Sequence, residues 1–126
     1  MNRTAVATSK APDAIGTYSQ AIAAGGTVYL SGQIPLIPET MTLVEGDIAA
    51  EVRQVFDNLS AVAEAAGGSL NQMVKLTVYL TDLGDFGTVN EVMAACFDAP
   101  FPARAAVEVA GLPKGARVEV DGIMLI

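Results

Sequence analysis

Arg104 stands in a segment whose residue types suit the binding of a carboxylate. It follows Phe101-Pro102, a stiff apolar entry to a strand, because a proline restricts its own backbone and that of the residue before it. The residues from Ala103 to Val109 alternate, so Arg104 projects from the face opposite to its immediate neighbours. A guanidinium held on a rigid strand presents a planar fork of donors that matches a carboxylate. The alternative is an ordinary arginine on a solvated face, paired with Glu108 or another neighbour.

Gly32 and Asn90 are two further positions with more than one interpretation. Gly32 lies inside an apolar strand pattern from Thr27 to Ile34, where it marks a bulge, a close approach of another group, or simple packing. The alternation places it on the same face as Val28, Leu30 and Ile34. Asn90 lies off the apolar stripe of its helix, so it is either solvated or directed into a site. Cys96 is interpreted as a small core residue rather than a reactive thiol.

The residue types that are missing restrict the available chemistry. The chain has no His, which excludes a Ser-His-Asp or Cys-His site and any histidine metal ligand. Its single Cys cannot form an intramolecular disulfide, a CxxC motif or a structural zinc site. There is no glycine-rich phosphate loop and no dinucleotide fingerprint. We therefore expect no metal and no cofactor, and chemistry based on carboxylates, arginine, tyrosine, hydroxyls and backbone groups.

The net charge and the hydropathy of the chain restrict the classes of partner that can be expected. Seven Lys and Arg against 14 Asp and Glu give a net charge of -7, which argues against a nucleic-acid partner because such proteins cluster cations. No run of about 18 apolar residues is present, so no membrane span is expected. The N-terminus lacks the apolar core of a secretory signal, and a cytoplasmic location is expected. The chain is 52% hydrophobic, which is high for a small domain and favours a homo-oligomer.

The hydrophobic pattern predicts one α+β domain over residues 1–126. The expected element order is β-β-β-α-β-α-β-β, a mixed sheet with two helices on one face. Asp47 is the expected N-cap of the first helix, Asp82 or Asp85 that of the second, and 39–46 is expected to be a surface loop. The strands are expected at 4–7, 21–24, 27–34, 73–80, 103–109 and 116–125. The uncovered face of this sheet carries too few polar residues for water, which again favours subunit association.

Five blocks in matching order and spacing resemble the RidA/YjgF/YER057c family of small imine deaminases. They cover nearly the whole chain: Ala14-Ile15-Gly16-x-Tyr18, Ser31-Gly32-Gln33-Ile34-Pro35, Asp82-Leu83-x-Asp85-Phe86-x-Thr88-Val89-Asn90, Phe101-Pro102-Ala103-Arg104 and Val118-Glu119. The resemblance implies a chorismate-mutase-like fold, a homotrimer with a pocket at each subunit interface, and no cofactor. It also implies hydrolysis of reactive 2-imino or 2-enamino acids, such as 2-aminoacrylate, to 2-keto acids and ammonia, which limits metabolite damage.

The same resemblance implies a role for each matching residue. Arg104 binds the substrate carboxylate, and Glu119 holds or activates the attacking water. Without the resemblance, Glu119 is interpreted as a surface carboxylate paired with Arg117. The expected substrate-binding residues, of which Gly32 and Ala106 act through backbone groups, are Tyr18, Ser31, Gly32, Asn90, Arg104 and Ala106.

The chain departs from the family pattern in three places. Thr17 replaces the usual proline before Tyr18, and Ala106 replaces the usual cysteine, which removes any thiol-based regulation. The loop before Phe101 is also shorter than in many relatives, which affects the pocket mouth.

The placement of Arg104 relative to Glu119 has two possible solutions. The turn at 112–115 predicts a local hairpin that brings the two residues side by side. The family fold instead seats the last strand between the Ser31 strand and the Val78 strand, so that Arg104 and Glu119 meet only between different subunits. We favour the second solution, because it accounts for the apolar surplus and for a glycine beside Glu119.

Two other functions remain open from the sequence. A non-catalytic trimer that binds a 2-keto acid for regulation would keep Arg104 but show no turnover. A ribonuclease or translation inhibitor, an activity ascribed to some family members, is disfavoured by the negative charge.

Overall fold

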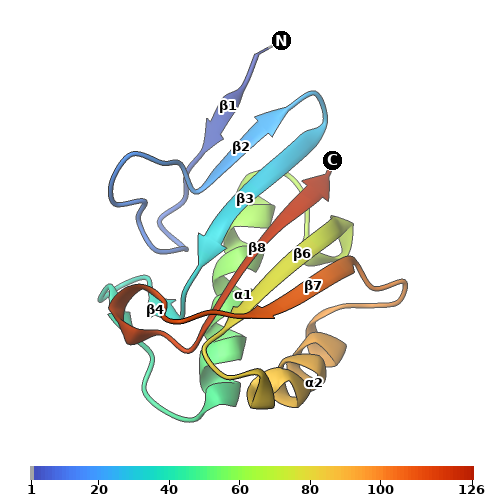
Figure 1. Ribbon diagram of the computed structural model, residues 1–126. Helices are drawn as coiled ribbons and strands as arrows, with labels where there is room; N and C mark the ends of the chain where they lie inside the picture. Colours follow the sequence, from blue (N-terminus) through green and yellow to red (C-terminus); the bar gives the residue numbers. More distant parts are fainter. Residues whose placement is uncertain (1) are drawn as a thin grey trace.

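The alternating segments of the sequence form the strands of one sheet, and the two segments with helical periodicity cover one of its faces (Figure 1). The computed structural model describes residues 2–126. Over these residues the main sheet has the order β1-β2-β3-β8-β6-β7. β6 and β7 are parallel, and the other pairs are antiparallel. The strands are β1 (Thr4–Val6), β2 (Ala21–Ala24), β3 (Thr27–Gln33), β6 (Met73–Leu80), β7 (Ala103–Glu108) and β8 (Val118–Leu125). The predicted α+β class and mixed sheet are confirmed.

β8 occupies a central position in this sheet, between β3 and β6. Its alternate residues Val118, Val120 and Met124 are fully buried, which suits a strand with a neighbour on each side and helices against one face. β7 lies at the sheet edge and runs parallel to β6, so the chain must cross β6 to enter β8. The local hairpin suggested by residues 112–115 is therefore wrong. These residues instead include a short 3₁₀ turn, Pro113–Gly115.

Helix α1 (Ile48–Ala65) begins where the sequence predicts. The Asp47 side chain accepts a hydrogen bond from the Ala50 N–H at 2.9 Å, which satisfies one of the free donors of the first turn. The apolar stripe of α1 packs on the sheet and supplies Val52, Val55, Phe56, Leu59 and Val62 to the core. Of the helices in the described part of the chain, none is long and apolar enough to cross a bilayer.

Two local features differ from the expected pattern. The segment 39–46 is not entirely a loop, because β5 (Thr42–Leu43) pairs with β4 (Leu36–Ile37) in a small hairpin of its own. Before helix α2 (Phe86–Cys96), the chain first makes a 3₁₀ turn over Leu83–Asp85. The Asp82 side chain accepts from the Gly84 N–H in that turn at 2.8 Å, so Asp82 and not Asp85 provides the side-chain cap.

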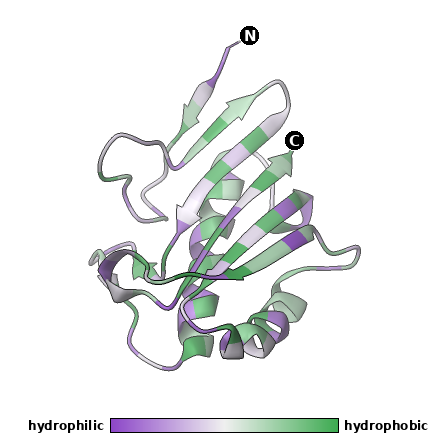
Figure 2. Ribbon diagram, viewed as in Figure 1, coloured by the Kyte–Doolittle hydropathy of each residue, from purple (hydrophilic) through white to green (hydrophobic). Residues whose placement is uncertain are grey.

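Within residues 2–126, no helix covers the second face of the sheet. In Figure 1 this open face is turned to the viewer, with α1 behind the strands, and Figure 2 shows residues of contrasting hydropathy alternating along β3 and β8. Several side chains on strands of this sheet are large, apolar and about half exposed: Tyr29 (53%), Val107 (42%) and Leu125 (49%). Exposed apolar groups on one continuous face are typical of an interaction surface.

Candidate functional site

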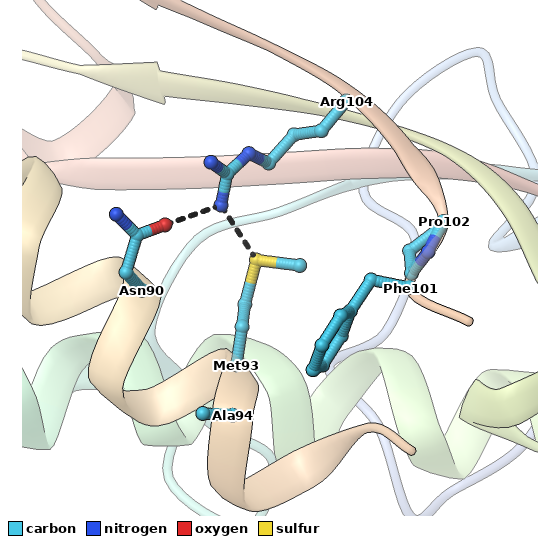
Figure 3. A pocket seen from close by; sticks show the side chains of 6 residues that line it. All are labelled: Asn90, Met93, Ala94, Phe101, Pro102 and Arg104. Atoms are coloured by element: carbon cyan, nitrogen blue, oxygen red, sulfur yellow. Dashed lines mark hydrogen bonds between the residues drawn. The ribbon is translucent and has the colours of Figure 1, made fainter. Parts of the chain in front are cut away.

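The Arg104 side chain lies on the helix-covered face of the sheet. Its strand partner Leu76 is fully buried under the helices, and paired residues of adjacent strands project from the same face. The guanidinium reaches α2, where Nη1 donates to Asn90 Oδ1 at 2.7 Å and lies 3.3 Å from Met93 Sδ (Figure 3). Its Cζ atom is 4.6 Å from the centroid of the Phe86 ring, a cation–π contact. Arg104 is thus oriented by neutral groups.

The charge of Arg104 is not neutralised by a carboxylate. In residues 2–126 the ion pair within 4 Å joins Arg117 to Glu51. Glu108, the neighbour proposed as a partner for a solvated Arg104, instead accepts a hydrogen bond from the Leu83 N–H at 3.0 Å. The proposed pairing of Arg104 with Glu108 is therefore wrong. Asn90, which was either solvated or directed into a site, is directed to the guanidinium.

One open cavity adjoins this guanidinium, and a second lies against the Phe86 ring on which it stacks. One has a volume of about 410 Å³ and is lined by Arg104, Asn90, Met93, Ala94, Phe101 and Pro102 (Figure 3). The other, of about 270 Å³, is lined by Phe86, Leu83 and Ala106, so the predicted site residue Ala106 lies beside the ring on which Arg104 stacks. A small acid bound by the guanidinium would therefore place its remaining atoms against mainly apolar walls.

The Glu119 carboxylate lies on the open face of the sheet. Its strand partner is Tyr79, which alternates along β6 with the buried residues Val78 and Leu80. Arg104 and Glu119 therefore project from opposite faces, with β6 between their strands. The alternative partner for Glu119 is also excluded, because Arg117 binds Glu51. One chain does not bring its two predicted catalytic residues together.

Gly32 makes room for the Glu119 side chain. Between Leu30 and Gln33 the register of β3 against β8 shifts by one residue, which is a β-bulge. The bulge places Gln33 on the buried face in place of Gly32, so the predicted face of Gly32 is wrong. A Cβ atom at position 32 would collide with the Glu119 carboxylate and lie 2.9 Å from its Cδ. Both the bulge and the close approach predicted for this glycine are confirmed.

Tyr18 and Ser31 lie on the Glu119 side of the molecule. Ser31 Oγ donates to the Ser19 carbonyl at 2.6 Å, which ties β3 to the loop that carries Tyr18. The Tyr18 hydroxyl accepts from the Ile15 N–H at 3.3 Å, and the ring is about half exposed. Tyr18, Gly32 and Glu119 share a cavity of about 450 Å³. The predicted residues thus form two groups, one around Arg104, Asn90 and Ala106, and one around Glu119, Gly32, Tyr18 and Ser31.

The electrostatic surroundings of Glu119 favour its protonated form. Partial burial raises the pKa of the Glu119 carboxyl, and the negative charge of Asp121 raises it further. The hydrogen bond from the Tyr79 hydroxyl to Asp121, 2.9 Å long, is the main cause that raises the pKa of Tyr79. In the described part of the chain, no side chain or backbone N–H donates to the Glu119 carboxylate within hydrogen-bond distance.

Four residues that shape these groups were not predicted as site residues from the sequence. Two of them, Phe86 and Met93, contact the Arg104 guanidinium. The other two, Asp121 and Tyr79, lie beside Glu119. The spacing of Glu119 and Asp121, two residues apart on one strand, was the available signal for their proximity. Among residues 2–126, no group of three or more acidic or cysteine side chains is arranged to hold a metal ion.

The sequence and the fold of this chain match those of known proteins. The model of the family described as endoribonuclease L-PSP, which includes the RidA/YjgF proteins, matches residues 8–126. The chain belongs to this family. It is 49% identical to the 2-iminobutanoate/2-iminopropanoate deaminase of Rattus norvegicus over 96% of this chain and 88% of that protein. It is 50% identical to protein DfrA of Myxococcus xanthus over 98% and 95% of the two chains.

Solved structures of the family share the fold. RidA from the Antarctic bacterium Psychrobacter sp. is 56% identical and superposes with a TM-score of 0.94 over 98% of this chain and 99% of its own. E. coli TdcF, solved with bound serine, is 38% identical and superposes with a TM-score of 0.91 over 98% of each chain. The expected chorismate-mutase-like fold of the RidA/YjgF proteins is thereby confirmed.

Proposed function

We propose that this protein hydrolyses 2-imino acids, and the 2-enamino acids that tautomerise to them, to 2-keto acids and ammonia. Arg104 carries the proposal, because its guanidinium is held in place by α2 while its charge stays available for the substrate carboxylate. Family members named 2-iminobutanoate/2-iminopropanoate deaminase in rat and human, 49% and 46% identical, support this reaction class. In the cytoplasm, such an activity would remove reactive imines before they damage other enzymes.

The chemistry that we propose needs no metal or cofactor. The carbon of a protonated imine is electrophilic, so a positioned water and a base are sufficient. Glu119 accepts a proton from the water as its oxygen bonds to the imine carbon, which gives a tetrahedral carbinolamine. Glu119 then returns the proton to the amine nitrogen and becomes a carboxylate again. This carboxylate takes the hydroxyl proton as the C–N bond breaks to give the keto acid and ammonia, and the ammonia leaves with that proton as ammonium.

We propose that the working site lies between two subunits of a homotrimer. Arg104 and Glu119 occupy opposite faces of one sheet, so an Arg104 group needs the Glu119 group of the partner subunit to complete a site. The exposed apolar side chains of the open face, including Tyr29 and Val107, support a subunit interface there. Asn90 holds Arg104, and backbone groups of Ala106 and Gly32, together with Tyr18 and Ser31, complete the substrate pocket.

A regulatory trimer that binds a 2-keto acid without turnover is the second candidate. The E. coli TdcF structure favours this candidate, because that protein has the same fold as this chain and was solved with serine, a small carboxylic acid, bound to it. The family description as an endoribonuclease suggests a third activity. The net charge of -7 gives it no support, because RNA binding draws on clustered cations.

The proposed function is tested by the release of pyruvate from 2-aminoacrylate. A serine dehydratase generates 2-aminoacrylate in the reaction, and pyruvate formation is followed with and without the protein. We expect the protein to accelerate pyruvate release and the Arg104→Ala variant to lose the acceleration. Pyruvate release at the rate of the protein-free reaction would contradict the proposal. Calorimetric titration with a 2-keto acid would then show whether the protein is a binder.

A further inference from the structure

Glu119 and Asp121 form an acidic pair on the open face of β8. Residues two apart on a strand project from the same face, and both side chains are partly buried. Two carboxylates at such a spacing repel each other when both are ionised, and the repulsion is strongest where water is scarce. A protein gains nothing in stability from this arrangement.

Tyr79 donates a hydrogen bond to only one of these two carboxylates. It lies opposite Glu119 in the strand register, whereas Asp121 lies opposite Thr77. The ring nevertheless reaches diagonally, and its hydroxyl donates to Asp121 Oδ2 at 2.9 Å. This hydrogen bond fixes the position of the Asp121 carboxylate on the open face. Glu119, which receives no such bond from the described residues, is the member whose proton affinity rises.

We propose that Asp121, fixed by the Tyr79 hydroxyl, is a positioning residue that sets the basicity of Glu119 for proton exchange with water. The inference rests on the proposed function and adds a residue to it. General-base catalysis becomes more efficient as the base strengthens toward the working pH. An ordinary glutamate is a weak base at neutral pH, and a negative neighbour strengthens it without touching the substrate.

The other groups that face Glu119 come from β6, from β3 and from the loops that line its cavity. β6 contributes Tyr79, and β3 contributes the uncharged backbone of Gly32. The cavity that Glu119 lines is also bounded by Asp13, Tyr18 and Lys114. Among these groups, the charge that raises the pKa of the Glu119 carboxyl is that of Asp121. Removal of this one charge is therefore the informative change.

The test combines the pH dependence of turnover with a titration that does not need turnover. The first readout is the pH profile of kcat/KM for 2-aminoacrylate hydrolysis. The second is the carboxyl-carbon NMR titration of Glu119, assigned by its absence in Glu119→Gln. For Asp121→Asn we expect the acid limb of the profile and the Glu119 titration both to move to lower pH. We expect the rate on the plateau to fall about two- to tenfold, because the base is weaker.

Three further variants make the outcome specific. Asp121→Glu keeps the charge and should restore both curves toward those of the wild type. Asp57→Asn removes the same charge from an exposed position on α1, behind the sheet, and should change neither. Asp121→Ser replaces Asp121→Asn if the latter does not fold, because it removes the same charge.

The possible failures are distinguishable. If the wild type shows no turnover, the proposed function fails, while the NMR titration still tests the coupling of the two carboxylates. If Asp121→Asn leaves the Glu119 titration unchanged, the inference is overturned. If the titration moves but the pH profile does not, Asp121 has no part in the reaction and the inference is overturned as well.

Discussion

The residues around Arg104 and the residues around Glu119 have opposite effects on the charged group that they surround. In the Arg104 group, the cation is surrounded by the Phe86 ring, the Asn90 amide oxygen and the Met93 thioether. In the Glu119 group, the carboxylate is partly buried and has the negatively charged neighbour Asp121. The first environment fixes the geometry of a charge, and the second raises its reactivity toward protons.

The difference follows from the tasks that we propose for the two groups. A residue that binds a carboxylate needs a fixed orientation and a permanent charge, and neutral partners provide the orientation without cancelling the charge. A residue that exchanges protons with water needs a pKa moved toward the working pH, and burial beside a like charge provides this. The comparison predicts that changes in the two groups have different kinetic signatures.

The largest effect is expected for Glu119→Gln, which removes the base but keeps the size of the side chain. We expect kcat for 2-aminoacrylate to fall by ~10²–10⁴, the usual contribution of a general base. Affinity for a 2-keto acid, which depends on Arg104, should persist. An unchanged kcat would remove the distinction between the two groups and favour the regulatory binder.

Gly32→Ala tests the space around Glu119. The added methyl group would displace the carboxylate, and a displacement of this size costs on the order of 10²-fold in kcat. Gly87→Ala is the matched control, because, apart from its chain neighbours and the adjacent backbone of α2, no described atom lies within 4 Å of a Cβ atom at that position. If Gly32→Ala and Gly87→Ala have equal rates, the close approach of Gly32 to Glu119 has no catalytic meaning.

Arg104→Lys tests the orientation of the cation. An ammonium cannot reproduce two parallel bonds to a carboxylate or the stacking on Phe86, so we expect a loss of about 2 kcal/mol or more, about 30-fold in kcat/KM. The effect should approach that of Arg104→Ala. Arg53→Lys, at an exposed position of α1, is the control and should retain the rate. Activity of Arg104→Lys within a few-fold of the wild type would show that Arg104 does not bind the carboxylate in this way.

The smallest expected effect is on stability. Because the pKa of Glu119 is raised in the folded state, that state binds its proton more tightly than the unfolded state, and stability falls as pH rises from the ordinary glutamate pKa through the raised value. Glu119→Gln lacks this loss. Its Tm should equal that of the wild type at acidic pH and exceed it slightly at neutral pH, since water screens the half-exposed carboxylate. A wild type more stable than Glu119→Gln at neutral pH would indicate a stabilising partner for the carboxylate.

The fold follows from the sequence wherever a pattern is long and one-sided. The apolar stripe of α1, its Asp47 cap and the alternation along β6 and β8 each specify one structure, and all are confirmed. The position of β8 in the sheet does not follow from the local sequence pattern, because the turn at 112–115 would also suit a hairpin between β7 and β8. The family resemblance decided that point, and the full burial of alternate β8 residues explains it.

The candidate site was less predictable than the fold. The face of Gly32 was wrong because a bulge shifts the alternation by one residue, and a sequence pattern with a strict period of two cannot show this. Phe86 and Asp121 were missed because their contacts depend on the packing of elements that are distant in sequence. Phe86 on α2 contacts Arg104 on β7, and Asp121 on β8 accepts a hydrogen bond from Tyr79 on β6. The residue types of the candidate site were therefore predictable. The resemblance also predicted that Arg104 and Glu119 do not meet within one chain, but the sequence did not predict the faces of the sheet from which they project.

The central claim is that one working site needs Arg104 from one subunit and Glu119 from another. Co-expression of Arg104→Ala and Glu119→Gln chains with different tags, followed by isolation of the mixed oligomers, tests it directly. Each variant alone should be nearly inactive. In every mixed cyclic trimer, one of the three sites combines an intact Arg104 with an intact Glu119, so about a third of wild-type activity should return. Mixed oligomers as inactive as the two parents would contradict a site shared between subunits.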